Sequence, residues 1–394
     1  MDLDTFRWLL TDAGQRLLVR ATDAYVDAAG DPVRVASAVR SIEPDANRAA
    51  TALTQVDLRR RGLAKFGDDA LRMYFTPDGL EQATRARVAA HRAARLAAAE
   101  PGSVLDLGCS IGGDLVAISR AGLTAAGVDV DPVRAAVAEA NLAALGLAGA
   151  VQVADATTVD VSGFGAVFVD PARRSGRGRE FKVDGWTPPW EFVAGLLGGR
   201  AVAKLAPGLP HDLVPEGVEA EWVSDEREVK EAALWSPYLA TARRRATVLA
   251  RDGLATLTEE DDPYDGQERP VRRLGAFLYE PDGAVIRAGL VTAVAAGVQG
   301  GLLDEQIAYV TSDLAFRSSF SRAYRVREQL PYREKQLRLA LKQRGIGRLT
   351  IKKRGVQVVP DELRSRLRLA GDAEATLVLT RIAGVGTAIL VDPL

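Results

Sequence analysis

The stretch 104–132, VLDLGCSIGGDLVAISRAGLTAAGVDVDP, constrains the fold of this chain more than any other part of it. An apolar run of β character comes first. A glycine-rich turn follows, where bare backbone must come close to another group. Residues 114–120 then have helical spacing, and residues 123–130 form a second apolar run with Asp129 near its end. This order predicts an open α/β sheet, whose ligands bind at the carboxyl ends of the strands.

Two more apolar runs downstream also lead into acidic residues. Residues 151–153 precede Asp155, and the fully apolar run 164–169, typical of a central parallel strand, precedes Asp170. Because the carboxyl ends of parallel strands meet at one edge of a sheet, we expect these acidic residues to lie at one site with Asp129.

The glycine turn reads DLGCSIGGD from Asp106, without the G-x-G-x-x-G spacing of dinucleotide-binding proteins. It resembles the first motif of class I S-adenosylmethionine (SAM)-dependent methyltransferases. The resemblance implies a Rossmann-like sheet and SAM as the cofactor, with the glycine turn against the amino-acid part of SAM and Asp129 on the ribose hydroxyls. A carboxylate suits a diol because it accepts two strong hydrogen bonds. The alternative is a βαβ unit that binds no ligand.

The same resemblance implies roles around the adenine of SAM. Asp155 would accept a hydrogen bond from the adenine amine, and Ala156 would offer its backbone N–H to the ring. The residues implied to contact SAM are Thr76, Asp106, Gly108, Cys109, Gly112, Asp129, Asp155 and Ala156.

The segment before the glycine turn also carries a resemblance. Residues 73–79, MYFTPDG, and residues 139–142, EANL, resemble trimethylguanosine-synthase-like RNA methyltransferases, in which such a lead-in covers the SAM pocket. The residues that would cover the pocket here are Phe75, Thr76, Gln82 and Thr84. The alternative is an ordinary helical cap with a loop.

The run Asp170-Pro171-Ala172-Arg173-Arg174 stands where these enzymes carry their catalytic motif, Asp/Asn-Pro-Pro-aromatic. Methylation of a base nitrogen needs an acceptor for the amine proton and a rigid turn, and it depends mostly on positioning and desolvation. Asp170, Pro171 and Arg173 are therefore the predicted catalytic residues. Because Ala172 and Arg173 depart from the motif, we expect Arg173 to stack on a base or to hold a phosphate.

Two tryptophans downstream are candidates for the missing aromatic face. Trp186 and Trp190 flank three residues that begin with Thr187. The alternative is a helix start, with Thr187 as the N-cap, Pro188 at the first helical position and both tryptophans in the core. Arg174 lies in a stretch rich in arginine, glycine and serine that we expect to clamp phosphates or to form a surface loop.

The cysteine and histidine content excludes other chemistry. Asp-Pro-Ala-Arg also resembles the motif of uridine-C5 RNA methyltransferases, which need a cysteine nucleophile. Cys109 is the single cysteine and lies inside the glycine turn, so uridine C5 chemistry is disfavoured. With two histidines and one cysteine, we predict no metal site.

Length and composition indicate a multidomain globular protein. The chain has 394 residues, of which 47% are hydrophobic and 26% charged. No apolar run reaches membrane-spanning length, and the first twenty residues lack a signal-peptide core, so we expect a cytoplasmic protein without a membrane partner. We predict a helical region that covers the cofactor site over 1–99, a methyltransferase domain over 100–255, a connecting region over 256–315 and a small α+β domain over 316–394.

The last of these regions is strongly basic. From residue 316 to residue 355 there are thirteen Arg or Lys and two Glu, although the whole chain has a net charge of −1. The order β-α-β-α-β-β predicts a small α+β layer, and residues 341–355 resemble the THUMP-like domain found behind bacterial methyltransferase cores. The resemblance implies RNA binding, by Arg344, Arg348, Lys352, Lys353 and Arg354. The alternative is that this basic face meets the acidic half of the same chain.

These features together favour a SAM-dependent methyltransferase that modifies a base nitrogen of tRNA or rRNA. One alternative is a methyltransferase for a small molecule or a protein. Another is a non-catalytic RNA-binding protein that retains the SAM fold, which the departure at Ala172 and Arg173 makes credible.

Overall fold

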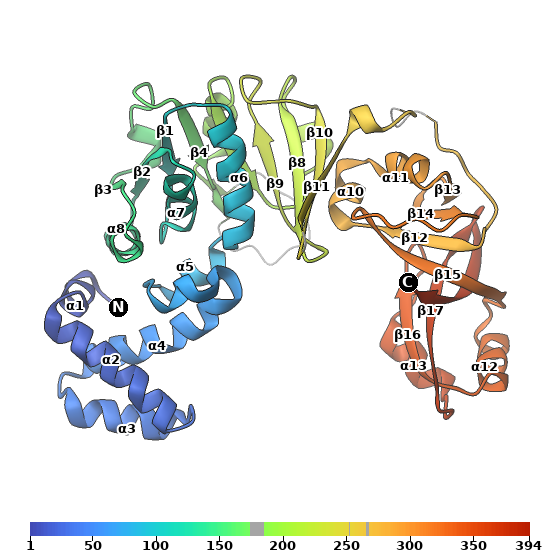
Figure 1. The fold of residues 1–394 in the computed structure, drawn as a ribbon, viewed down its shortest axis with the longest axis horizontal. Helices are drawn as coiled ribbons and strands as arrows, with labels where there is room; N and C mark the ends of the chain where they lie inside the picture. The colour runs from blue at the N-terminus through green and yellow to red at the C-terminus, as the bar shows by residue number, and fades with distance from the viewer. Residues whose placement is uncertain (174–184, 252, 265–267) are drawn as a thin grey trace. The chain divides into compact units, whose positions relative to one another are not determined.

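A computed structural model describes residues 1–173, 185–251, 253–264 and 268–394 (Figure 1). The chain divides into two compact units. One contains Met1–Leu205, Pro210–Val218 and Leu234–Ala240, and the other contains Ala206–Leu209, Glu219–Ala233 and Thr241–Leu394. In the described part of the chain, no helix combines the length and the apolar character needed to cross a membrane.

The first unit opens with six α-helices, and all of them except α6 begin at a side-chain cap. The helices are α1 (Leu3–Leu9), α2 (Asp12–Asp27), α3 (Pro32–Ile42), α4 (Ala46–Phe66), α5 (Pro77–Gln82) and α6 (Ala86–Ala98). Asp31 accepts from the backbone N–H groups of Val33 and Arg34, and Pro32 occupies the first helical position of α3. Phe6, Leu9 and other apolar side chains of α1–α4 form a core that also includes Val137 of the later helix α8.

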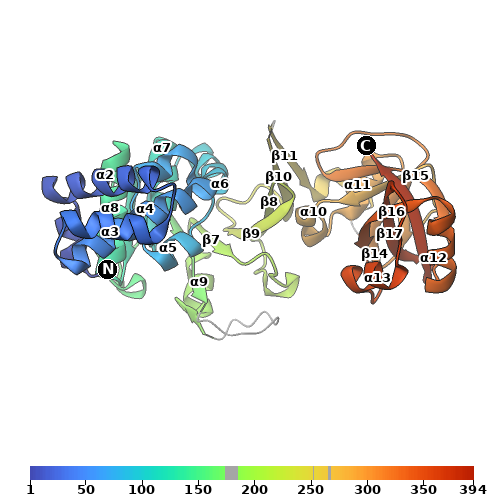
Figure 2. The same ribbon diagram turned by 90° about the horizontal axis from the view of Figure 1, so that it is seen from below.

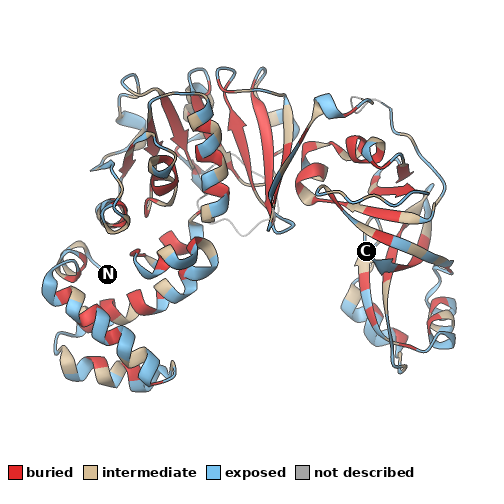
Figure 3. Ribbon diagram, in the orientation of Figure 1, coloured by how far each residue is buried: buried red, intermediate tan, exposed pale blue. Residues whose placement is uncertain are grey.

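The large sheet has the Rossmann-like arrangement that the sequence predicts. Its parallel strands are β1 (Ser103–Leu107), β2 (Thr124–Asp129), β3 (Ala150–Val153), β4 (Ala166–Val169) and β7 (Ala201–Leu205). The helices α7 (Gly113–Arg120), α8 (Pro132–Leu145) and α9 (Trp190–Leu196) connect them, and α9 lies on the opposite side of the sheet from α6 and α7 (Figure 2). Strand β4 is buried along its whole length, as a central parallel strand requires (Figure 3).

Four further strands follow β7 along the chain. They are β8 (Glu219–Asp225), β9 (Glu228–Trp235), β10 (Arg244–Ala250) and β11 (Gly253–Thr258). The strand order of the sheet is β11-β10-β8-β9-β7-β4-β1-β2-β3. Strand β11 directly precedes the acidic turn that begins at Glu259.

Two buried amide side chains hold the segment that leads into the glycine turn. Asn141 of α8 accepts from the backbone N–H of Tyr74 (2.6 Å) and donates to the Tyr74 carbonyl (3.0 Å). The same amide donates to the carbonyl of Ile111 in the glycine turn (2.8 Å). Gln55 of α4 pairs in the same two-sided way with the backbone of Phe75, at 3.0 and 2.7 Å. These hydrogen bonds fix residues 74–75 between α4, α8 and the glycine turn.

The second unit contains a seven-stranded sheet in the order β13-β14-β12-β15-β18-β17-β16. Its strands are β12 (Phe277–Pro281), β13 (Gly301–Asp304), β14 (Ile307–Ser312), β15 (Ser321–Leu330), β16 (Ile346–Lys353), β17 (Ala373–Ile382) and β18 (Val385–Pro393). Its helices are α10 (Gly283–Ala288), α11 (Val291–Gly297), α12 (Glu334–Gln343) and α13 (Pro360–Leu367). The predicted β-α-β-α-β-β order is confirmed from β15 to β18. Strands β12–β14 were not predicted, and they extend the same sheet.

We predict that Asn141→Ala destabilises the first unit by about 3 kcal/mol, because three buried backbone groups lose their partner. Urea unfolding of the full chain, followed by tryptophan fluorescence, measures this loss. Asn47→Ala is the control, because Asn47 is exposed. Equal midpoints for the two variants would contradict the anchoring role of Asn141.

Candidate active site at the strand ends

The candidate site lies where the strand order of this sheet reverses. Along β3-β2-β1-β4-β7 the direction of winding changes between β1 and β4, which pair in parallel with Leu107 opposite Val169. Loops that leave the strands on either side of such a point diverge and open a site. A Cβ atom built on Gly108 would lie 4.0 Å from the carbonyl oxygen of Asp170, so the glycine turn and the predicted catalytic turn are neighbours.

The glycine turn requires glycine for two separate reasons. Gly108 and Gly112 have φ angles of +88° and +78°, which side chains disfavour. A Cβ on Gly112 would also lie 3.0 Å from the Cβ of Ala138 on α8. The backbone N–H groups of Gly108 and Cys109 both donate to the carbonyl of Val128 on β2, each at 2.9 Å. The turn that the sequence predicts is thus held tightly against β2 and α8.

Asp129 and Asp155 follow β2 and β3 but have different surroundings. Asp129 is buried and accepts from the backbone N–H groups of Ser110 and Asp131, each at 2.9 Å. Asp155 is exposed and caps the short helix η2 (Ala156–Thr158). Hydrogen bonds from the backbone N–H and the hydroxyl of Thr157 hold the pKa of Asp155 below its ordinary value. Asp129 therefore orders the turn, whereas the Asp155 carboxylate has hydrogen bonds only to Thr157 among the described residues.

Asp106 is a buried carboxyl within β1. It is 1% exposed, and its Oδ1 atom has no hydrogen-bond partner in the described residues. Burial raises the pKa of Asp106 well above 3.8, and the nearby carboxylates of Asp114 and Asp170 raise it further against a smaller opposing effect of Arg92. These surroundings favour the protonated form of the carboxyl.

Among the described residues, more carboxyl groups than cationic groups lie around Asp106. Asp114 pairs with Arg92 of α6, and Asp170 pairs with Lys204 of β7. Asp106 and Asp129 add two further acidic groups that act on each other electrostatically. The hydroxyl of Ser110 is also buried without a hydrogen-bond partner among the described residues. Unpaired acceptors and surplus acidic groups suit a cationic ligand that carries hydrogen-bond donors.

The ion pair between Lys204 and Asp170 was not predicted from the sequence. Val169 is opposite Ala203 across β4 and β7, which brings the next residues of the two strands together. The Lys204 side chain is 15% exposed and that of Asp170 is 33% exposed, so the pair is partly shielded from water. Lys204 stands out only as a charged residue near the end of an otherwise apolar strand, and its partner depends on the strand order.

The segment that carries Trp186 pairs with the residues that follow Asp170 and Pro171. Strand β6 (Trp186–Thr187) pairs with β5 (Ala172–Arg173), and the rings of Trp186 and Trp190 meet edge to face with centroids 5.8 Å apart. The interpretation of Thr187 as a helix N-cap is wrong. Thr187 lies in β6, and α9 begins at Trp190 after Pro189. Arg174 lies outside the described residues.

Cys109 lacks the properties of a nucleophile. The thiol is 5% exposed. Burial, and then the charges of Asp106 and Asp129, raise its pKa far above its ordinary value. Among the described residues, no group of three or more His, Cys, Asp or Glu side chains is arranged to hold a metal ion.

The basic residues predicted to bind RNA in the second unit are mostly paired within that unit. The contacts are Arg344 with Glu328 at 2.5 Å, Arg348 with Glu374 at 2.5 Å, Lys352 with Glu280 at 3.1 Å, and Arg354 over the ring of Tyr309 at 5.4 Å. Lys353 is exposed and has no ion pair in the described residues. The positive charge of this set is therefore partly neutralised by carboxylates of the same sheet.

Comparison with known proteins identifies relatives of the whole chain. Over 345 residues, the chain is 40% identical to uncharacterized S-adenosylmethionine-dependent methyltransferases of Mycobacterium tuberculosis strains H37Rv and CDC 1551. The alignment covers 84% of this chain and 92% of each relative.

Two segments also match described families, and one solved structure shares the fold. Residues 321–393 match the family described as THUMP domain-like, and residues 2–62 match a domain of unknown function, DUF8688. A crystal structure from Porphyromonas gingivalis W83, of a protein with a proposed methyltransferase activity, has a TM-score of 0.74 at 22% identity. It covers 96% of this chain and 98% of its own.

We predict that Asp106→Asn changes how stability depends on pH. The folded pKa lies above 3.8, so above that pH the unfolded chain binds fewer protons than the folded chain. The stability contributed by the neutral Asp106 carboxyl is therefore present at low pH and is lost as pH rises toward the folded pKa. The unfolding free energy of the wild type should fall relative to Asp106→Asn by as much as about 1.4 kcal/mol per pH unit.

Urea unfolding at pH 5, 6 and 7 measures this difference. Asp155→Asn is the control, because the exposed Asp155 has a lowered pKa and titrates below this range. A constant difference between the wild type and Asp106→Asn over the three pH values would show that Asp106 is ionised in the folded chain.

Proposed function

Because this chain belongs to the S-adenosylmethionine-dependent methyltransferases, we propose that it methylates a base nitrogen of tRNA or rRNA and that the strand-end site is its active site. The observation that carries this proposal is the clustering of the glycine turn, Asp129 and Asp170 where β1, β2 and β4 end. SAM supplies a methyl group activated by a sulfonium centre.

The residues at the strand ends fit SAM. SAM carries two positive groups, a sulfonium and an ammonium, and one negative carboxylate. The site has surplus acidic groups and hydrogen-bond acceptors without partners among the described residues. Asp106 and the glycine turn would receive the amino-acid part, and Asp129 the ribose. Asp155 and Ala156 would receive the adenine. Thr76 lies at the start of α5, with its hydroxyl accepting from the backbone N–H of Gly79 at 3.0 Å, and would cover the pocket.

Asp170 and Pro171 would position the nucleophile. One carboxylate oxygen of Asp170 contacts Lys204, and Oδ1 has no hydrogen-bond partner among the described residues. That oxygen would accept from an N–H of the base, while Pro171 keeps the turn rigid. A neutral nitrogen needs little acid–base assistance, so holding it in line with the methyl group is the main task. Trp186, next to Arg173 in the β5–β6 pair, would contribute the aromatic face.

The RNA substrate is supported by the second unit. The match to THUMP domain-like sequences covers β15 to β18, and the excess of arginine and lysine lies in the same segment. Polyanions bind such surfaces through their phosphates, and this binding weakens as salt is added.

We predict that purified protein transfers labelled methyl from SAM to the tRNA or rRNA fraction of cells that lack this gene. Nucleoside analysis of the labelled fraction would then identify the methylated atom. Asp170→Ala should reduce the transfer rate by about 100-fold or more, because the nucleophile loses its positioning group, and should leave SAM affinity nearly unchanged.

Two results would count against this proposal. If Asp170→Ala lost SAM affinity, Asp170 would belong to the cofactor site. If SAM bound but no RNA fraction took up label, the substrate would be a small molecule or a protein, or the protein would bind RNA without catalysis.

We predict that Lys204→Met lowers kcat by about 10-fold or more and changes KM for RNA and Kd for SAM by less than about twofold. The reason is that Asp170 loses the cation that fixes one of its oxygens. Lys204→Arg restores the positive charge and should recover most of the activity. If both variants lost SAM affinity to the same extent, Lys204 would act through the fold and not through Asp170.

A further inference from the structure

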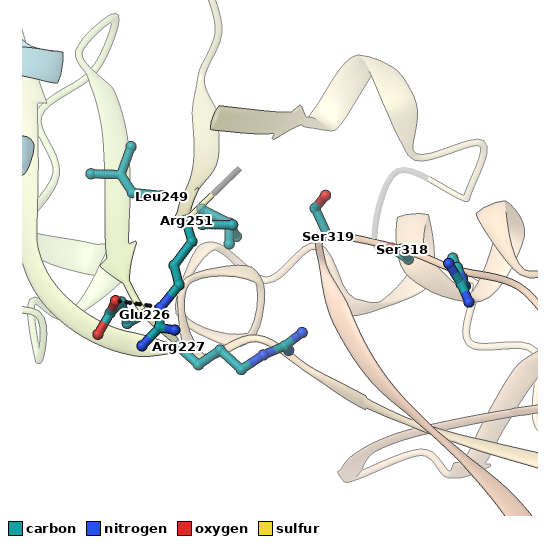
Figure 4. Close-up of a pocket in the computed structure, with 9 residues that line it drawn as sticks. Glu226, Arg227, Leu249, Arg251, Ser318 and Ser319 are labelled. Carbon is teal, nitrogen blue, oxygen red and sulfur yellow. Dashed lines mark hydrogen bonds and ion pairs between the residues drawn. The ribbon is translucent and has the colours of Figure 1, made fainter. Parts of the chain in front are cut away.

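A second concave site lies within the second unit. A cavity of about 600 Å³ is lined by the turn between β8 and β9, by the end of β10 and by a segment before β15. The polar residues that line it are Glu226, Arg227, Arg251, Arg317, Ser318 and Ser319. Figure 4 shows that Arg227 and Arg251 come from one side of the opening, and Ser318 and Ser319 from the other.

The turn that carries Arg227 has an unusual backbone. Glu226 and Arg227 alone connect β8 to β9. Both have a left-handed backbone conformation, with φ angles of +50° and +70°. Glycine and asparagine are the residues that favour this conformation in two-residue turns. The backbone N–H of Glu226 donates to the Leu249 carbonyl of β10 at 3.1 Å, which fixes the turn. Strained positions of this kind concentrate at functional sites.

The charges of the cavity are unbalanced. Arg251 pairs with Glu226 at 3.3 Å, whereas Arg227 and Arg317 have no ion-pair partner in the part of the chain that the structure describes. This differs from Arg344, Arg348 and Lys352, each of which has a carboxylate partner. Two unpaired guanidinium groups and two serine hydroxyls therefore face one opening, and all of them can donate to an oxyanion.

We propose that this cavity binds a phosphate group, and that the phosphate is a backbone phosphodiester of RNA. The second part rests on the proposed function. A guanidinium group matches a phosphate with two parallel hydrogen bonds. The volume exceeds that of one phosphate and falls in the range of nucleotide-sized ligands. Contacts to the phosphates here would position the RNA without reading its sequence. Recognition of the base to be methylated would take place separately, at Asp170.

Anisotropy of a fluorescent 12-nucleotide single-stranded RNA, titrated with the full chain at several KCl concentrations, tests the proposal. The variant Arg227→Ala/Arg317→Ala should weaken binding about 10-fold and reduce the slope of log K against log[salt] by about 1.4, which corresponds to two lost phosphate contacts. The control Arg20→Ala/Arg40→Ala removes two exposed arginines from α2 and α3 and should leave the slope unchanged. In a second experiment, isothermal titration calorimetry measures the binding of inorganic pyrophosphate to the wild type and to the same variant.

The possible outcomes distinguish a failure of the cavity proposal from a failure of the proposed function. If RNA binding kept its affinity and slope in Arg227→Ala/Arg317→Ala, the cavity proposal would be overturned while an RNA substrate stood. If RNA did not bind, but pyrophosphate bound and lost affinity in that variant, the phosphate site would stand and the RNA substrate would fall. If neither probe bound the wild type, both proposals would be overturned.

Discussion

The hydrogen bonds of Asn141 are the interaction on which the candidate site of the first unit depends. One amide on α8 satisfies both backbone groups of Tyr74 and the carbonyl of Ile111. A buried carbonyl or N–H without a partner is costly, so these three groups are stable only in this arrangement. The glycine turn, the lead-in segment and α8 therefore take their positions together, and Gln55 repeats the pattern one residue further along. Five hydrogen bonds of two amide side chains thus join the helical part of the first unit to the glycine turn and α8.

Charge gives the strand ends their chemical character. The fold places acidic groups at the ends of several strands of one sheet, and among the described residues Arg92 pairs with Asp114 and Lys204 with Asp170. Burial lessens this imbalance because it raises the pKa of Asp106 and so favours its protonated form. Lys204 leaves Asp170 with one engaged and one available oxygen, which is a suitable state for a group that orients an amine.

Much of this site could be predicted because its residues are local to strand ends. The glycine turn, Asp129, Asp155 and Asp170 each follow an apolar run, and the parallel sheet brings such positions to one edge. Lys204 could not be predicted, because its partner depends on which strand lies beside β4. The pairing of Thr187 in β6 also depends on a contact with Ala172 fifteen positions away. In the second unit, the carboxylates that neutralise Arg344 and Arg348 come from β15 and β17, so composition alone overstated the free positive charge.

The position of β15 in the seven-stranded sheet decides where this protein can be divided. Strand β15 pairs with β18 on one side and with β12 on the other, from Phe277–Arg325 to Pro281–Ser321. The segment that matches THUMP domain-like sequences begins at β15, so a fragment cut there would expose a row of unsatisfied N–H and C=O groups along a former interior strand. Such an edge recruits other chains. The THUMP-like part of this protein is therefore no detachable module, and a fragment intended for isolated study, or for transfer to another enzyme, has to begin before Phe277.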